Sequence, residues 1–302
     1  MNKFRQIALI GPTASGKTAL AIAYAKKYNA NILSLDSLAI YKEIDIVSAK
    51  PTVAEREGIT HFGLDVIYPD EPFDVTIFIK LYRQAREQSI AEGKSLVIVG
   101  GTGFYLKSLI DGMSTMPNIR EASQEKTHQC LIAGIPEAHR FLYDLDPSYM
   151  QNIETTDRYR IEKMLDLYFE TGLTPTAYFQ ANPPQPVITD ALPIYEIVVD
   201  RVVLRERIRI RTHQMIERGL IDEIFYLESK YTRAPNCMKA IGIRETLDYF
   251  DGYYSKAELI EKIIINTARL AKRQRTFNAS QFSDKVSLPL EELTILLLDG
   301  VA

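Results

Sequence analysis

Eight consecutive residues near the N-terminus have the types and spacing of a phosphate-binding loop: Gly11, Pro12, Thr13, Ala14, Ser15, Gly16, Lys17 and Thr18. The glycines allow the backbone to curl so that successive N–H groups point at one centre, and a following helix adds its positive N-terminus. Lys17 can reach a phosphate as a point charge, and the Thr18 hydroxyl can ligate Mg²⁺. The pattern G-x-x-x-x-G-K-[ST] therefore predicts a site for a pyrophosphate-like group.

Two further polar residues follow apolar stretches that have the character of buried strands. Asp36 ends the stretch 32–36, and Thr102 follows the glycines at the end of the stretch 95–101. The Asp36 carboxylate could ligate Mg²⁺ or act as a general base, or it could merely cap a helix or pair with Lys17. Thr102 could hold a substrate amine or hydroxyl, although a tight turn would explain the glycines around it.

Basic residues gather in two segments of the second half of the chain. The first holds Arg201, Arg205, Arg207, Arg209 and Arg211, in which Arg205 and Arg209, and Arg207 and Arg211, are i,i+4 neighbours. The second holds Arg269, Lys272, Arg273 and Arg275. A solvated helix surface would explain either segment alone. Two such segments beside a phosphate loop favour a surface for RNA phosphates, or arginines that neutralise a leaving group.

The elements that position these residues alternate in type along the first third of the chain. Strands are expected at 7–10, 32–36 and 95–101, and helices at 19–26 and, capped by Asp74, at 75–91, with an irregular segment at 37–72. Strands that alternate with helices predict a parallel α/β sheet, whose ligands bind beyond the carboxyl ends of the strands. Gly11, Asp36 and Thr102 all lie at such ends.

From residue 117 to residue 193 the pattern becomes mostly helical, with helices expected at 123–133, 136–145 and 156–171 and a linker at 182–186. A strand pattern returns at 193–200, and helices are expected at 202–230, 243–251 and 256–277. The fold class expected is α/β: a P-loop NTPase-like parallel sheet flanked by helices, with a mostly helical insertion domain. Residues 1–116 plus 194–302 would form the core domain, and residues 117–193 the insertion.

Composition excludes several classes of protein. The 302 residues are 46% hydrophobic and 25% charged, with a net charge of −3, as in a globular protein without an overall preference for nucleic acid. No apolar run approaches the ~20 residues of a membrane span, and the N-terminal apolar run is too short for a signal peptide. The two cysteines and four histidines show no metal-ligand spacing. A cytoplasmic protein without a membrane partner is expected.

Taken in order along the chain, the motifs resemble those of the bacterial tRNA dimethylallyltransferases. The resemblance is carried by Gly11–Thr18, Asp36-Ser37-x-x-Ile40-Tyr41, Asp45-Ile46-x-x-Ala49-Lys50-Pro51, Val99-Gly100-Gly101-Thr102-Gly103-x-Tyr105, Asp157-Arg158, Glu170-Thr171-Gly172, Arg207-Ile208 with Arg211, Ile241-Gly242 and Ala271-Lys272-Arg273-Gln274. It extends from about residue 7 to about residue 277.

The resemblance implies the transfer of a dimethylallyl group from dimethylallyl diphosphate to N6 of adenosine 37 in tRNA, which forms N6-(dimethylallyl)adenosine and diphosphate. It implies that the loop 11–18, with Mg²⁺ on Thr18, holds the leaving diphosphate, and that Arg211 neutralises its charge. Asp36 matches the family's base, and Thr102 matches the residue that orients the amine. The implied partners are dimethylallyl diphosphate and the anticodon stem-loop of tRNA, and a monomer is expected.

The same resemblance places a set of residues on tRNA-contacting segments: Asp36, Ser37, Leu38, Ala39, Thr102, Arg120, Asp157, Arg158, Tyr159, Arg160, Ile161, Lys239, Ala240, Ile241, Gly242, Ile243, Arg244, Lys272, Arg273, Gln274, Arg275 and Phe277. Phe277 stands where many members have Trp, which keeps a stacking face and loses an N–H donor. Asp157 stands where relatives often have Gln or Pro.

Two other functions are compatible with parts of the pattern. The phosphate loop alone would favour a nucleotide or metabolite kinase, but a compact kinase needs neither the helical insertion nor two basic segments. An RNA-binding regulator with a vestigial loop would not need Lys17, Thr18, Asp36 and Thr102 together.

Overall fold

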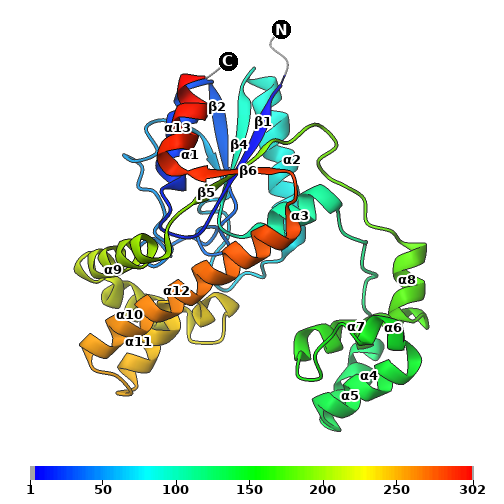
Figure 1. Ribbon diagram of the computed structural model, residues 1–302. Helices are drawn as coiled ribbons and strands as arrows, with labels where there is room; N and C mark the ends of the chain where they lie inside the picture. The colour runs from blue at the N-terminus through cyan, green and yellow to red at the C-terminus, as the bar shows by residue number, and fades with distance from the viewer. Residues whose placement is uncertain (1–3, 301–302) are drawn as a thin grey trace. The chain divides into compact units, whose positions relative to one another are not determined.

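The computed structural model describes residues 4–300, which form two compact units (Figure 1). The first unit comprises the chain up to Lys107 and again from Ile188 onward. The second unit is the intervening segment, Ser108–Val187. The chain thus leaves the first unit once and returns to it once, so the second unit is an insertion in the first.

The first unit contains a six-stranded sheet in which every strand pair is parallel. The order is β3-β2-β4-β1-β5-β6, with bounds β1 Gln6–Ile10, β2 Ala30–Ser34, β3 His61–Phe62, β4 Ser95–Gly100, β5 Ile194–Val198 and β6 Lys285–Pro289. The predicted parallel α/β fold class is confirmed. Because β4 lies between β1 and β2, the carboxyl ends of these three strands are neighbours at one edge of the sheet.

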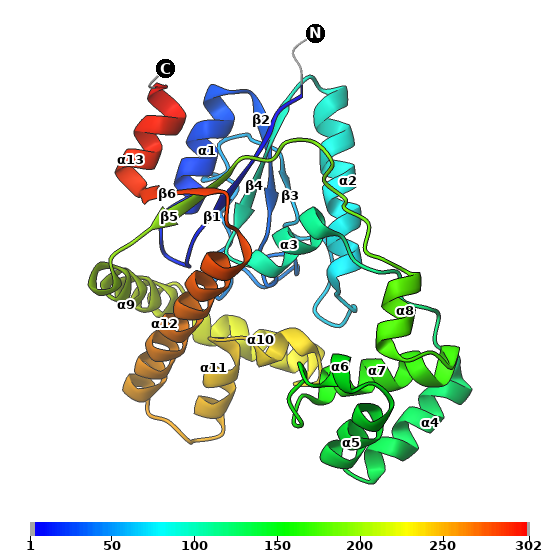
Figure 2. The same cartoon turned by 45° about the vertical axis from the view of Figure 1, so that its right-hand side comes forward.

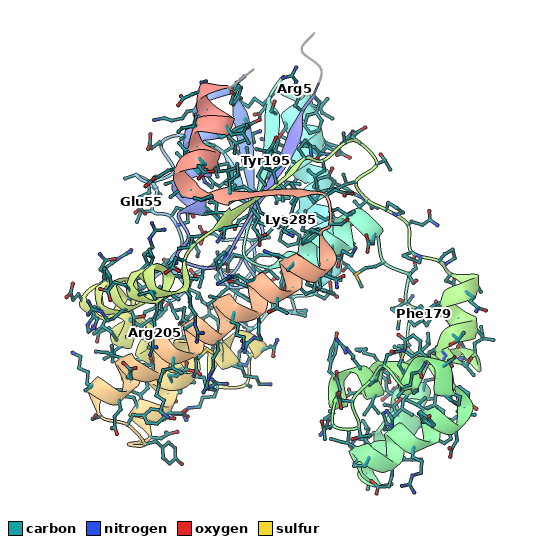
Figure 3. The ribbon with its side chains drawn as sticks, viewed as in Figure 1. Arg5, Glu55, Phe179, Tyr195, Arg205 and Lys285 are labelled. Atoms are coloured by element: carbon teal, nitrogen blue, oxygen red, sulfur yellow. The ribbon has the colours of Figure 1, made fainter. Side chains whose placement is uncertain are left out.

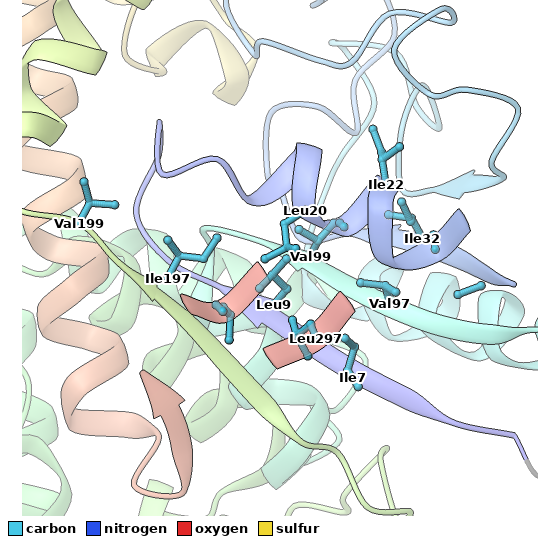
Figure 4. Close-up of a cluster of buried hydrophobic side chains, with 14 of the residues drawn as sticks. Ile7, Leu9, Leu20, Ile22, Ile32, Val97, Val99, Ile197, Val199 and Leu297 are labelled. Carbon is cyan, nitrogen blue, oxygen red and sulfur yellow. The ribbon is translucent and has the colours of Figure 1, made fainter. Parts of the chain in front are cut away.

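The central strands are mostly apolar because helices cover both of their faces. Ile7 and Leu9 of β1 pack in one cluster with residues of α1 (Lys17–Lys27), and Leu293 and Leu297 from α13 (Leu290–Thr294) and the π-helical turn η2 (Ile295–Asp299) join it (Figure 4). Helix α2 (Val75–Ala91) lies on the opposite face, as Figure 2 shows. There the Tyr82 hydroxyl donates a hydrogen bond of 2.9 Å to Gln6 Oε1.

The predicted start of α2 is confirmed in detail. Asp74 is its N-cap residue and accepts hydrogen bonds from the backbone N–H groups of Thr76 and Ile77. This bonding satisfies two of the donors that an α-helix leaves unpaired at its N-terminus.

Beyond the carboxyl ends of the strands lie helices α9 (Arg201–Glu217), α10 (Leu220–Tyr231), α11 (Ile243–Phe250) and α12 (Lys256–Gln281), with a 3₁₀ turn η1 at Asn236–Lys239 (Figure 1). The prediction of one helix over 202–230 is wrong. Gly219 adopts a left-handed conformation with φ 97°, which ends α9 and starts α10. The segment from β6 onward, which follows α12, had no counterpart in the sequence prediction.

The second unit is helical, as predicted, with α4 (Glu121–Ile132), α5 (Ile135–Leu145), α6 (Pro147–Met150), α7 (Arg158–Thr171) and α8 (Pro175–Ala181). Its own core includes the fully buried side chains of Leu142, Ile161 and Leu165. Helix α3 (Gly103–Asp111) starts in the first unit and ends in the second. A separate core is consistent with folding as a distinct body.

The boundaries of the second unit differ from the predicted 117–193. The segments that enter and leave it pair with each other: Met113 and Gln185 form an antiparallel bridge, and the Val187 N–H donates to the Leu109 carbonyl at 3.0 Å. These contacts assign both connecting segments to the inserted unit, whose limits are therefore 108–187. Composition alone does not reveal such pairing.

Within residues 4–300, no helix has the length and apolar character that crossing a membrane requires. Cys130 and Cys237 are both free thiols. The described part of the chain contains no group of three or more His, Cys, Asp or Glu side chains arranged to hold a metal ion.

Candidate active site

The phosphate loop connects β1 to α1, as its spacing predicts. Lys17 is the first residue of α1, and its side chain is buried. Its Nζ donates a hydrogen bond to the Pro12 carbonyl at 2.6 Å and lies 3.4 Å from Ser15 Oγ. The lysine side chain is thus folded back on the loop. Thr18 is exposed, lines the cavity above the loop, and makes no hydrogen bond through its hydroxyl to any residue that the structure describes.

Burial lowers the pKa of Lys17 from its ordinary value of 10.5 to about 7. The positive charge of Arg211 acts in the same direction, and the negative charge of Asp36 opposes both. The three side chains therefore interact electrostatically at the end of the sheet. A bound anion would favour the charged form of the lysine, because its negative charge would attract the ammonium group.

Two cavities meet at the carboxyl ends of the strands. The first, of about 910 Å³, lies over the phosphate loop, and the second, of about 440 Å³, contains Thr102 in its wall. Their linings share seven residues: Thr13, Ala14, Asp36, Ser48, Arg211, Met215 and Gln274. The shared wall means that a group bound in one cavity can lie next to a group bound in the other.

Asp36 occupies this shared wall and is held in a fixed position by the backbone. Its Oδ1 accepts hydrogen bonds from the N–H groups of Leu38 at 2.8 Å and Ala39 at 3.1 Å. The other carboxylate oxygen has no hydrogen-bond donor among residues 4–300, so it remains available for a ligand. The sequence left open whether Asp36 pairs with Lys17, and the structure shows no hydrogen bond or ion pair between them.

Helix α9 supplies a basic face to the first cavity. Arg211 Nη1 donates to Thr13 Oγ1 and Arg207 Nη1 to the Ser15 carbonyl, each at 3.4 Å. Gln214 and Arg218 continue the same lining at the next helical turns. The helical spacing 207, 211, 214 and 218 could have predicted this face from the sequence. Arg205, by contrast, lies on an exposed part of α9 (Figure 3).

Gln274 has a contact that the sequence analysis did not predict. Its Oε1 accepts a hydrogen bond of 2.9 Å from the Thr13 N–H in the phosphate loop. A residue of α12 that was expected on a tRNA-contacting segment thus also supports the loop. The two residues are 261 positions apart, which places this contact beyond any local sequence pattern.

The second cavity brings together many of the residues expected to contact tRNA. Its lining includes Asp36, Ser37, Leu38, Thr102, Lys239, Ala240, Ile241, Gly242, Arg244, Arg273 and Gln274. Ala39 lines the first cavity instead. Lys272 and Arg275 are exposed on α12, and the Phe277 ring lies beside Gly103. The Ile243 side chain is fully buried and cannot reach a ligand.

The remaining residues of the expected tRNA set lie in the second unit. Arg120 forms an ion pair with Glu170, with Nε and Oε1 2.6 Å apart. Asp157 is the N-cap of α7, where its carboxylate accepts from the Arg160 N–H, and this explains the acid at that position. Arg158, Tyr159 and Arg160 are exposed on the first turn of α7, whereas the Ile161 side chain is buried in the core.

Comparison with known proteins assigns this arrangement to a family. A model of the family described as IPP transferase matches residues 39–281. The chain is 60% identical to a tRNA dimethylallyltransferase from Sulfurovum sp. (strain NBC37-1) over 98% of both chains.

Two solved structures are similar in fold. One is the full-length tRNA isopentenylpyrophosphate transferase from Bacillus halodurans, with 29% identity, a TM-score of 0.70, and coverage of 97% of this chain and 94% of that one. The other is a eukaryotic dimethylallyltransferase acting on tRNA, with a TM-score of 0.84 and coverage of 98% and 76%. At 23% identity, this second similarity supports the fold alone.

Proposed function

The chain belongs to the IPP transferase family, and from this premise we propose that it is a tRNA dimethylallyltransferase. The reaction moves the dimethylallyl group of dimethylallyl diphosphate to N6 of adenosine 37 in tRNA. The observation that carries the proposal is the meeting of two cavities at Asp36, one over a phosphate loop and one beside Thr102. A transferase with a diphosphate donor and a bulky acceptor needs two binding spaces that share the reacting atoms.

The first cavity suits the diphosphate. The N–H groups of loop 11–18, the N-terminus of α1, Lys17, Arg207 and Arg211 present positive charge to it. When the bond between the dimethylallyl C1 and the diphosphate oxygen breaks, both electrons leave with the oxygen. Arg211 stabilises the negative charge that develops there, from its position beside Thr13.

The second cavity suits the adenine. The N6 amine attacks C1 of the dimethylallyl group and loses one proton, which the available oxygen of Asp36 accepts. Thr102, in the same lining, orients the amine by a hydrogen bond. Adenosine 37 leaves the stacked anticodon loop to reach this position, at a cost of a few kcal/mol. The basic segments 239–244 and 272–275 offset part of that cost by binding the RNA.

The residues present also fit Mg²⁺, which we propose as the cofactor. Magnesium prefers oxygen ligands and keeps several waters, so it needs few protein groups. The Thr18 hydroxyl lines the first cavity and has no hydrogen-bond partner in the described chain, so it is available as an oxygen ligand. The ion would neutralise charge on the diphosphate. We further propose that the protein acts as a monomer in the cytoplasm, where tRNA serves in translation.

The test is an incubation of the purified protein with dimethylallyl diphosphate and tRNA, followed by mass spectrometry of the tRNA nucleosides. N6-(dimethylallyl)adenosine at position 37 is the expected product, and a tRNA with guanosine at position 37 is the matched control. ATP hydrolysis without prenyl transfer would instead support a kinase and would overturn the proposal.

A further inference from the structure

Glu223, near the start of α10, binds a distant loop through three backbone groups. Its Oε2 accepts hydrogen bonds from the N–H groups of Asp45 at 2.9 Å and Ile46 at 2.7 Å, and its Oε1 accepts one from Val47 at 2.9 Å. Within residues 4–300, these three N–H groups have no other acceptor. A single carboxylate therefore satisfies three successive donors, and hydrogen bonds to a charged acceptor are the strong ones.

The loop that Glu223 holds forms part of the wall where the two cavities meet. Val47 is buried and lines the second cavity, and Ser48 lines both. Residues 49–51 continue into the lining of the first cavity. A shift of this loop would therefore change the shape of the space proposed for the acceptor nucleotide.

Val47 also makes a close contact with the segment opposite. Gly242 has φ 93°, and a Cβ atom built on it would lie 2.5 Å from Val47 Cγ2, so another residue would be excluded both by conformation and by space. Gly242 belongs to the segment 239–244 that lines the second cavity. The position of Val47 thus sets how closely the loop approaches this segment.

The two ends of the loop are anchored differently. On the side of the first cavity, Lys50 Nζ donates to the Tyr41 carbonyl at 2.8 Å, to Asp65 Oδ1 at 2.6 Å and, across the loop, to Asp45 Oδ1 at 2.7 Å. On the side of the second cavity, the anchor is Glu223. The hydrogen bond of 2.9 Å from the Ala49 N–H to the Ile46 carbonyl joins the two ends within the loop. Asp45 is also bonded to Lys50, whose N–H donates to the Asp45 carbonyl at 3.1 Å, so loss of the Glu223 anchor would free chiefly Val47.

We propose that Glu223 is a positioning residue for the acceptor nucleotide. It acts through Val47, whose contact with Gly242 fixes the spacing between the loop 45–48 and the segment 239–244. The inference rests on the proposed function, because it assumes that the second cavity takes the adenosine of tRNA. It predicts that loss of the carboxylate affects tRNA and leaves dimethylallyl diphosphate largely unaffected.

The test is Glu223→Gln, which keeps the size of the side chain. The amide has one acceptor oxygen, and its NH₂ group would face a backbone N–H, so at least one loop donor loses its partner. We expect the KM for tRNA to rise about tenfold and the KM for dimethylallyl diphosphate to change less than about twofold. Hydrogen exchange at the amides of residues 45–47 should become faster in the same variant.

The matched control is Asp222→Asn, on the neighbouring, exposed position of the same helix turn. Both KM values should equal those of the wild type. Val47→Ala provides a second test that leaves the Glu223 carboxylate intact, and it should also raise the KM for tRNA selectively. If Glu223→Gln does not fold, Val47→Ala decides the question.

An equal rise of both KM values, or a lower melting temperature with unchanged KM values, would overturn the proposal in favour of a purely structural role. A wild-type protein that transfers no dimethylallyl group would instead contradict the proposed function. The two failures are therefore distinguishable.

Discussion

At the scale of the residue, the protonation of Lys17 links anion binding to pH. In the free protein, its pKa is about 7, whereas its ordinary value is 10.5. Between these values, the unfolded chain binds more protons than the folded one, so Lys17 makes the protein more stable as pH rises through this window. A bound diphosphate favours the charged lysine, so binding above pH 7 requires the uptake of a proton.

The affinity for dimethylallyl diphosphate is therefore expected to fall with pH above 7, by up to about one log unit per pH unit. Isothermal titration calorimetry in buffers of different ionisation enthalpy measures the proton uptake directly. Lys17→Met should bind weakly and show no such uptake. Equal uptake in wild type and variant would assign the titration to another group.

Asp36 accepts two backbone hydrogen bonds and is our proposed base, and different substitutions separate these two roles. Asp36→Asn keeps an oxygen for the N–H groups of Leu38 and Ala39 and removes the base, whereas Asp36→Ala removes both. We expect Asp36→Asn to lower the single-turnover rate at least about 100-fold, with the Kd for tRNA nearly unchanged. Rapid-quench kinetics and filter binding measure the two quantities. A weakened Kd with a normal chemical step would contradict the role of Asp36 as base.

At the scale of the element, the break at Gly219 sets the direction of two functional helices. It separates α9, which carries Arg207 and Arg211, from α10, which carries Glu223. Gly219→Ala should destabilise the protein by about 1 kcal/mol because a residue with a Cβ atom is strained at φ 97°. Gly219→Asn should cost less, since asparagine tolerates this conformation. Urea denaturation measures both, and equal stability of the Ala variant and wild type would refute the argument.

At the scale of the whole molecule, the residues expected to contact tRNA are divided between the two units, whereas those expected to hold the diphosphate lie in the first. Every residue that lines the two cavities belongs to the first unit, whereas Arg120 and the exposed residues 158–160 belong to the second. We therefore expect the phosphate loop to bind dimethylallyl diphosphate without the second unit. The affinity for tRNA should fall when the second unit is removed.

Replacement of residues 114–184 by a short Gly-Ser linker tests this separation. The paired residues Met113 and Gln185 provide adjacent ends for the linker. We expect dimethylallyl diphosphate affinity within about threefold of the wild type, and tRNA affinity reduced at least about tenfold with a shallower dependence on salt. Unchanged tRNA affinity would assign its recognition to the core alone. The melting transition of the shortened protein controls for folding.

The sequence by itself determined the features that depend on neighbouring residues. The phosphate loop follows from the spacing of Gly11, Gly16 and Lys17, and the start of α2 follows from Asp74. Parallel sheets place the carboxyl ends of their strands together, so Asp36 and Thr102 could be assigned to one edge of the sheet from the sequence. The helix expected over 202–230 could also have been divided correctly at Gly219, because glycine commonly ends helices.

The tertiary structure alone decided the contacts between segments far apart in the chain. Gln274 accepts a hydrogen bond from the Thr13 N–H, 261 positions away in the sequence. Glu223 accepts one from the Val47 N–H, 176 positions away. Such pairs leave no periodic signal, because hydrogen bonds between distant segments depend on how the helices pack and not on local spacing. The limits of the inserted unit were decided in the same way, by the pairing of Met113 with Gln185.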